Sequence, residues 1–212
     1  MTNGITVVIA SYNYGHLIAQ CIESVLAQTI KPTRILVVDD GSSDNTVEIA
    51  NKYGLEVIQR KNNLGVIENY NDVLFNHIKT KKVMFLGGDD YLNPQYLEKM
   101  NLDYDIVSCD ITLVGPYAHK VRKGMRTEFK DGYWIWRFQP TNILRKNYIH
   151  GSSVFNAELA KRVGGYEAMR NRKMKKEEDW KCWRKMIGAG GTHFHVPVNL
   201  LFYRQHAFNN NR

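Results

Sequence analysis

The sequence predicts an α/β fold in which a mixed, mainly parallel sheet is flanked by helices. Short apolar runs rich in β-branched residues alternate with segments whose apolar residues follow helical spacing. Continuous apolar runs are typical of parallel strands that are buried on both faces. The chain has 212 residues, of which 43% are hydrophobic and 24% charged, as is ordinary for a globular protein. We therefore expect one domain spanning residues 1–212.

The first two strands and helices have clear local signals. Ile5–Ala10 is a β-branched run and predicts the first strand. Apolar residues within Leu17–Leu26 recur at the spacing of one helical face and predict a helix. Arg34–Asp39 predicts the second strand. Ser43–Asp44 then supplies cap residues for a helix that runs to about Tyr53.

The alternation of strand and helix signals continues through the first half, and the pattern becomes irregular beyond about Cys109. No internal repeat or low-complexity linker interrupts the chain. The remaining expected elements are a strand at 55–59, a helix at 67–78, a strand at 83–86, a helix at 178–187, and two short strands around Pro197 within 192–203.

Cysteine usage and hydropathy bear on the compartment. Cys21, Cys109 and Cys182 are odd in number and widely spaced, which favours free thiols in a reducing compartment. The apolar run at 5–10 is shorter than a signal-peptide core, and no run approaches the ~18 apolar residues of a membrane span. We expect a cytoplasmic protein without a transmembrane segment, while a peripheral membrane contact stays open.

The formal net charge is +8, and the basic residues gather between Lys120 and Lys185. Such a surface attracts phosphate on a nucleotide, a nucleic acid or an anionic lipid. A solvated basic face that aids solubility explains the same pattern. The charge alone therefore does not identify a partner.

Polar residues follow each of the first four predicted strands. In a parallel sheet the carboxyl ends of the strands meet at one edge, where ligands collect. Any one of these segments reads equally well as a plain turn, but together they predict a binding pocket. The four segments are 11–13, 39–42, 62–65 and 87–90.

The adjacent carboxylates Asp89 and Asp90 end the fourth strand. Like charges at this spacing repel each other, and a hard divalent cation relieves the repulsion. The pair therefore predicts a metal site.

Several motifs together resemble the inverting glycosyltransferases of family 2, which have the GT-A fold and use nucleotide-diphosphate sugars. The resemblance runs from Ile5 through Arg204, and the segment at 35–46 is its most specific part. It implies a nucleotide-binding half at about 1–110 and an acceptor-binding half at about 111–212. The matching segments are 7–13, Gln28, 35–46, 63–65, 88–90 and 178–180.

The resemblance assigns the nucleotide contacts. Asp40 matches the position that accepts a hydrogen bond from N3–H of uracil. Ala10 and Tyr12 match positions that line the base pocket, with Tyr12 available for stacking. Gly65 permits close approach of the backbone, and Asn69 is expected to reach the ribose or a phosphate. Asp39, outside this set, is expected to order the turn or contact the ribose.

The resemblance also implies a cofactor, Mn²⁺ or Mg²⁺. The family motif is usually Asp-x-Asp, and Gly88 stands where its first carboxylate is expected. Asp90 is then a metal ligand, and Asp89 a ribose or sugar contact. His206 is a candidate further ligand and would favour Mn²⁺, whereas Arg204 would instead pair with a phosphate.

Asp179, in a Glu-Asp-Trp segment, matches the general base that an inverting transfer needs. An acidic helix N-terminus stabilised by the macrodipole explains the same residues. Trp180 and His150 are candidate acceptor contacts, although core packing accounts for them as well. The aromatics at 133–136 form either an acceptor platform or part of the core.

The expected function is metal-dependent, inverting transfer of a hexose, with glucose as the leading donor sugar, from a UDP-sugar to an acceptor hydroxyl. The acceptor stays open among a saccharide, a lipid-linked sugar, a protein and a nucleic acid. One alternative is a nucleotidyltransferase of similar fold, which would favour a glycine-rich, basic loop where this chain has 11–15. The other is an inactive basic module that binds nucleotide or nucleic acid.

Overall fold

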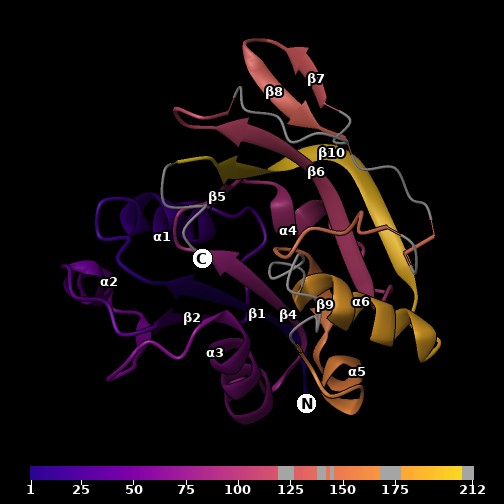
Figure 1. The fold of residues 1–212 in the computed structure, drawn as a ribbon, viewed down its shortest axis with the longest axis horizontal. Helices are drawn as coiled ribbons and strands as arrows, with labels where there is room; N and C mark the ends of the chain where they lie inside the picture. The colour runs from indigo at the N-terminus through magenta and orange to yellow at the C-terminus, as the bar shows by residue number, and fades with distance from the viewer. Residues whose placement is uncertain (119–126, 138–141, 144–145, 168–177, 207–212) are drawn as a thin grey trace.

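The computed structural model describes residues 1–118, 127–137, 142–143, 146–167 and 178–206. Strands and helices alternate through the first half, as the sequence predicts (Figure 1). The strands are β1 (Thr2–Ser11), β2 (Arg34–Asp39), β3 (Glu56–Gln59), β4 (Thr80–Gly87), β5 (Tyr91–Leu92), β6 (Ile106–Val114), β7 (Thr127–Lys130), β8 (Tyr133–Trp136), β9 (Val154–Asn156) and β10 (His193–Arg204). The helices are α1 (Ile18–Leu26), α2 (Thr46–Lys52), α3 (Val66–Asp72), the π-helical turn η1 (Val73–His77), α4 (Tyr96–Lys99), α5 (Ala157–Arg162) and α6 (Glu178–Gly188).

The strands form one mixed sheet in the order β3-β2-β1-β4-β9-β6-β10-β5, and the β7–β8 hairpin joins it along β6. The pairs β1–β2, β1–β4, β2–β3 and β6–β10 are parallel. Short β9 runs antiparallel to both β4 and β6 and so links the two halves of the sheet. The predicted α/β fold with a mixed, mainly parallel sheet is therefore confirmed.

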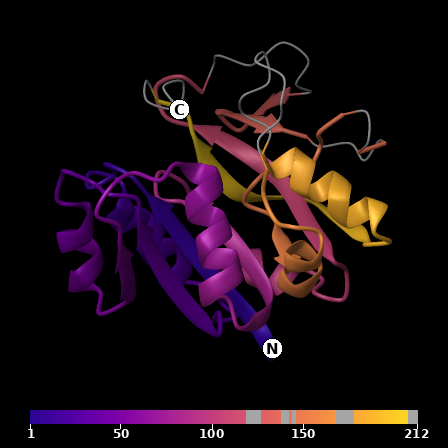
Figure 2. The same cartoon turned by 60° about the horizontal axis from the view of Figure 1, so that its bottom comes forward.

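Helices cover both faces of the sheet (Figure 2). On one face, α1 packs its apolar side on Val7 and Ile9 of β1 and on Leu86 of β4. On the other face, the cluster around Phe85 and Phe155 includes residues of α5 and α6. The strands are therefore buried on both sides, which explains why they read as continuous apolar runs.

The observed elements differ from the expected ones in three main places. The predicted helix at 67–78 is α3 followed by a π-helical turn, in which Ile78 N–H donates to the carbonyl of Val73 at 3.1 Å. The two strands expected around Pro197 are one strand, β10, whose register with β6 shifts between Val196 and Asn199. A bulge is the usual accommodation, because proline has no N–H to donate.

The third difference is β6, which the sequence does not predict. All nine of its residues are buried, including the polar Ser108, Asp110 and Thr112. These side chains break the apolar run, and their burial depends on partners far away in the sequence. Among the helices of the described residues, none is long and apolar enough to cross a membrane.

A fully buried amide joins α1 to the segment after β5. The Gln28 Nε2 donates to the carbonyls of Ser24 at 3.0 Å and Asn93 at 2.8 Å, and its Oε1 accepts from Leu97 N–H at 3.0 Å. Gln28 therefore holds α4 and the chain after the acidic pair against the end of α1.

We expect Gln28→Ala to lower the free energy of unfolding by about 3 kcal/mol, because three buried backbone groups lose their partner. Urea denaturation measures this loss. The matched control is Gln59→Ala, on an exposed side chain at the end of β3, which should change stability by less than about 0.5 kcal/mol. Equal effects of the two substitutions would contradict the account.

Candidate active site at the carboxyl edge of the sheet

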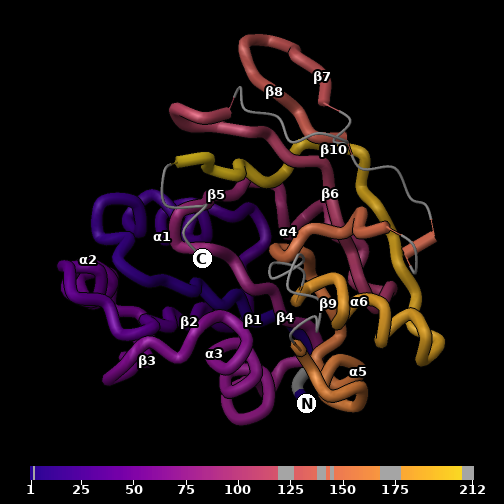
Figure 3. The backbone as a smooth tube through the Cα atoms, viewed as in Figure 1, coloured from indigo at the N-terminus to yellow at the C-terminus, as the bar shows by residue number. Residues whose placement is uncertain are grey.

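The carboxyl ends of four parallel strands meet at one edge. Ser11 of β1 pairs with Asp39 of β2, and Asp39 pairs with Gln59 of β3. On the other side, Ala10 of β1 pairs with Gly87 of β4. The tube in Figure 3 follows these ends to the loops that leave them. The four polar segments expected to form one pocket are thus neighbours in space.

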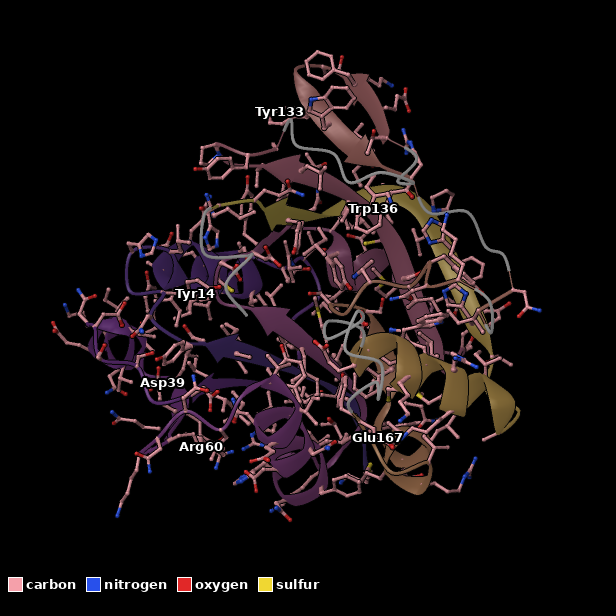
Figure 4. The ribbon with its side chains drawn as sticks, in the orientation of Figure 1. Tyr14, Asp39, Arg60, Tyr133, Trp136 and Glu167 are labelled. Carbon is pink, nitrogen blue, oxygen red and sulfur yellow. The ribbon has the colours of Figure 1, made fainter. Side chains whose placement is uncertain are left out.

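Asp39 organises the turn after β2. Its Oδ2 accepts from the N–H groups of Gly41 at 3.2 Å and Ser42 at 3.0 Å, and its Oδ1 from the Ser42 hydroxyl. Asp39 and Arg60 lie at neighbouring strand ends (Figure 4). Gly41 has φ +82°, and a Cβ there would lie 2.8 Å from the backbone of Asn62, so the turn requires glycine. Of the two roles expected for Asp39, the structure shows the turn.

Asp40 fixes the loop before α3. Its two carboxylate oxygens accept from the N–H groups of Leu64 and Gly65, both at 2.9 Å. Gly65 has φ +81° and stands at the N-cap of α3. Each oxygen has a second lone pair, so this bonding is compatible with a ligand contact. The sequence alone did not indicate the loop role.

The other expected nucleotide residues differ in accessibility. Tyr12 is 41% exposed at the end of β1, so its ring is available for stacking, and Ala10 beside it is half-buried. Asn69 is buried, and its Oδ1 accepts from Arg60 Nε at 3.2 Å. Arg60 also forms an ion pair with Asp72. Asn69 therefore helps hold a polar network behind the loop.

The acidic pair is held by the end of β10. Asp90 Oδ1 accepts from Arg204 N–H at 2.8 Å, and the Arg204 Nε donates to the Asp89 carbonyl at 2.8 Å. His206 Nε2 lies 3.0 Å from Asp89 Oδ2. The His206 ring also packs edge-on against Tyr14, with 5.7 Å between ring centroids. His206 thus contacts Asp89 of the pair, whereas the expectation associated it with the Asp90 metal site.

Arg204 is oriented by protein groups. Its Nη2 donates to Gln20 Oε1 at 2.5 Å, and its guanidinium lies 5.5 Å from the centre of the Tyr91 ring. Together with the bond to the Asp89 carbonyl, these contacts direct the side chain along the acidic pair. The expectation that Arg204 pairs with a phosphate would require part of this arrangement to open.

Gly87 and Gly88 lie against different side chains. A Cβ at Gly87 would lie 2.6 Å from Asp89 Oδ1 and 3.5 Å from Asp90 Oδ2. A Cβ at Gly88 would instead meet the Ser11 side chain, 2.9 Å from its Oγ. The glycine that faces the acidic pair is therefore Gly87. The sequence predicts the missing carboxylate of the motif one residue later, at Gly88.

The donor set fits a divalent cation whose coordination a substrate completes. Asp89 and Asp90 supply hard carboxylate oxygens that lie next to Gly87, and the His206 imidazole lies against the far oxygen of Asp89. No group of three or more His, Cys, Asp or Glu side chains that could hold a metal occurs in the described part of the chain. Mg²⁺ and Mn²⁺ sites that act on phosphates commonly use one or two carboxylates plus phosphate oxygens.

Asp179 stands at the N-terminus of α6. Its Oδ1 accepts from Trp180 N–H at 2.6 Å and from Asn147 Nδ2 at 3.4 Å. A Cβ at Gly151 would lie 3.5 Å from its Oδ2. The carboxylate is thus oriented by a loop that approaches closely at a glycine, and both the macrodipole role and the base role are compatible with this geometry.

The structure does not support the two expected acceptor contacts. Trp180 is 8% exposed, its indole N–H donates to the Ile143 carbonyl at 2.6 Å, and Arg184 covers its ring. His150 is buried beneath its loop, with Nε2 3.3 Å from the backbone nitrogen of Cys109, and burial lowers its pKa to about 3. Trp180 belongs to the cluster on the α6 face of the sheet, and His150 is buried against Cys109 of β6.

The aromatics at 133–136 divide between the two faces of β8. Trp134 and Trp136 are half-buried and pack against the cluster on the α1 face of the sheet, while Tyr133 is 52% exposed. Tyr133 is therefore the most exposed of the three aromatics in this segment.

Gly87→Ala should weaken Mn²⁺ binding in the presence of UDP by about tenfold, because the new Cβ would displace the Asp89 carboxylate. The loss of the free Mn²⁺ signal in electron paramagnetic resonance measures the affinity. Gly188→Ala is the control, since no atom lies within 4 Å of the added Cβ. Unchanged Mn²⁺ affinity in Gly87→Ala would exclude the proposed arrangement of the acidic pair.

Known proteins share both the sequence pattern and the fold. The sequence model of Glycosyl transferase family 2 matches residues 6–175. A putative glycosyltransferase, EpsE of Bacillus subtilis, is 25% identical over 95% of this chain and 73% of its own length. An uncharacterized glycosyltransferase of Haemophilus influenzae is 26% identical over 95% of this chain and 65% of its own length.

Two solved structures illustrate the shared fold. S. aureus TarS in complex with UDP-GlcNAc has a TM-score of 0.71 at 19% identity, covering 95% of this chain and 58% of that one. The mannosyltransferase PcManGT from Pyrobaculum calidifontis, in complex with GDP-Man and Mn²⁺, has a TM-score of 0.66 at 17% identity, covering 97% and 57%. The chain spans less than two thirds of the length of either structure. Because the family model matches most of the chain and these glycosyltransferases share its architecture, this protein belongs to glycosyl transferase family 2 and has the GT-A fold expected from its sequence.

Proposed function

We propose that this chain transfers a hexose from a UDP-sugar to an acceptor hydroxyl with inversion, with glucose as the leading donor sugar. The observation that carries the proposal is the meeting of Asp40 and the acidic pair at one carboxyl edge of a GT-A sheet. Residues 1–110 would form the nucleotide-binding half and residues 111–212 the acceptor-binding half.

The nucleotide would lie along the ends of β1, β2 and β3. Tyr12 offers an exposed ring to the base, and Asp40 offers a carboxylate for the uracil N3–H. Gly65 brings backbone close to the same point, because its N–H is already held by Asp40. TarS is solved with UDP-GlcNAc and PcManGT with GDP-Man, so the choice of uridine rests on Asp40 and on the binding test below.

A divalent cation, Mn²⁺ or Mg²⁺, would be held by Asp90, with Asp89 and His206 beside it. When bound, such an ion supplies Lewis-acid assistance to the departing diphosphate. Mn²⁺ is present in the PcManGT structure. The protein groups contribute orientation, since the Arg204 N–H holds the Asp90 carboxylate and the Arg204 side chain holds the backbone carbonyl of Asp89.

Asp179 would accept the proton of the acceptor hydroxyl as its oxygen attacks the anomeric carbon. Asn147 and the N–H of Trp180 hold one carboxylate oxygen, and the other lies by Gly151.

Membership of the family favours glycosyl transfer over nucleotidyl transfer. The inactive-module alternative differs from the proposal only in turnover. The two experiments that follow separate binding from turnover.

UDP at a hundred times its Kd should raise the melting temperature by about 5 °C or more in Mn²⁺ and much less in EDTA. Binding at that excess adds about 2.7 kcal/mol to the folded state. Differential scanning fluorimetry measures both shifts, and GDP in place of UDP tests the base. Equal shifts in Mn²⁺ and EDTA would remove the metal from the proposal.

Asp179→Asn should keep the UDP-induced shift and lose transfer by about 10²- to 10⁴-fold, the usual contribution of a general base. Release of UDP from the donor sugar that gives the largest thermal shift measures turnover. Trp180→Phe is a control for local packing of α6, since it retains a ring in the core. Undiminished turnover in Asp179→Asn would exclude Asp179 as the base.

A further inference from the structure

One face of the β7–β8 hairpin carries polar and aromatic groups that have no role in the proposed binding of the nucleotide sugar. Side chains alternate along a strand, so Tyr133, Ile135 and Arg137 point to the same side. In the register of the hairpin, Glu128 lies opposite Ile135. Figure 4 labels Tyr133 on the projecting hairpin and Trp136 nearer its base. We call Glu128, Tyr133 and Arg137, with Asp110 behind them, the Arg137 face.

Two carboxylates fix the Arg137 guanidinium. Its Nη1 donates to Asp110 Oδ2 at 2.8 Å, and its Nε donates to Glu128 Oε2 at 3.2 Å. Asn199 Oδ1 lies 3.5 Å from the same Nη1. The bond to Asp110 is the main reason that the pKa of Arg137 is raised. The side chain is therefore held in one orientation without a ligand.

The orienting carboxylate is itself locked in the sheet. Asp110 is 2% exposed, and its Oδ1 lies 3.1 Å from Nε2 of His195. His195 in turn has Nδ1 2.9 Å from the Ser108 hydroxyl. The chain of contacts extends from β6 across β10, so it anchors Arg137 in the body of the sheet.

Hydrogen-bonding groups of Arg137 and Glu128 remain exposed on the outer side of the Arg137 face. Arg137 is 35% exposed in its side chain, and its Nη2 has no hydrogen-bond partner within the described ranges. Glu128 is 50% exposed and uses Oε2 for Arg137. Tyr133 adds an exposed aromatic ring four residues along the strand, about 13 Å from Arg137 between Cα atoms.

We propose that the Arg137 face binds the acceptor and that this acceptor is a saccharide chain. Sugar hydroxyls both donate and accept hydrogen bonds, so they match a guanidinium beside a carboxylate. The apolar face of a sugar ring matches the exposed Tyr133 ring. A span of about 13 Å suits an oligosaccharide better than a single ring. The inference rests on the proposed glycosyltransfer and specifies its acceptor class.

The local charge argues against a phosphate-rich partner at this face. Arg137 stands between two carboxylates, so a phosphodiester would meet Asp110 and Glu128 as well as the guanidinium. A neutral hydroxyl has no such repulsion. Nucleic acid and anionic membrane are therefore disfavoured here, although the second half as a whole is basic.

The face begins beside the donor edge. Trp134, next to Tyr133, pairs with Leu113 of β6, and the following Val114 pairs with Arg204 of β10. Arg204 N–H holds Asp90. A chain laid from Arg137 toward Tyr133 therefore runs toward the strand ends that carry the acidic pair (Figure 1).

The experiment measures binding of linear malto-, cello- and chito-oligosaccharides to the whole protein with UDP and Mn²⁺, by saturation-transfer difference NMR. At least one series should bind, and Tyr133→Ala and Arg137→Gln should each weaken it by about tenfold. Tyr133→Phe keeps the ring and should bind as the wild type does. Phe129→Ala is the matched control, because Phe129 is 61% exposed on the opposite face, 5.2 Å from Trp134.

Several outcomes overturn the proposal. No binding in any series does so, as does an equal loss in Phe129→Ala and Tyr133→Ala. Binding of the same variants to phosphatidylglycerol vesicles or to single-stranded RNA, weakened in parallel while sugars are unaffected, points to another class of partner. The UDP-induced thermal shift is measured on every variant: if it persists while sugars fail to bind, only the acceptor inference is wrong. Arg137→Lys serves as a second variant if Arg137→Gln unfolds.

Discussion

Two adjacent carboxylates in a buried setting need compensation, and the end of β10 supplies it. The Arg204 N–H donates to the Asp90 carboxylate, the Arg204 side chain donates to the backbone carbonyl of Asp89, and His206 lies against the Asp89 carboxylate. These contacts join positions more than a hundred residues apart in the sequence. Because β10 runs parallel to β6, the same strand also places the acceptor-side sheet next to the acidic pair. The geometry of the donor edge thus depends on the last strand of the fold.

The neighbouring residues Asp39 and Asp40, in the turn after β2, stabilise different parts of the structure. The Asp39 carboxylate orders its own turn, since it accepts from groups of residues two and three positions ahead. Asp40 reaches across to the loop before α3, so it couples two strand ends. A ligand bound at Asp40 would therefore meet a loop that is already ordered, which lowers the entropy lost on binding.

The sequence predicts the first half well because its signals are local. Runs such as Arg34–Asp39 carry both the strand pattern and the turn chemistry, and β2 has those bounds. The second half depends on distant partners: Asp110 in β6 is buried, and Arg137 and His195, both far away in the sequence, bond to its carboxylate. His150 and Trp180 are buried, and the sequence left both roles open because no local pattern separates a core ring from a ligand contact. The sequence could not predict that Gly87 lies against the acidic pair, because this contact depends on the side-chain orientations of Asp89 and Asp90.

The central claim is that this edge performs inverting transfer from a nucleotide sugar. Proton NMR of slow donor hydrolysis tests it without an acceptor, because water takes the place of the acceptor hydroxyl. With Mn²⁺ and the UDP-sugar that gives the largest thermal shift, an α-linked donor should release the β-anomer first, and the rate should fall in EDTA and in Asp179→Asn. Initial release of the α-anomer, or hydrolysis no faster than in the protein-free blank, would contradict the account.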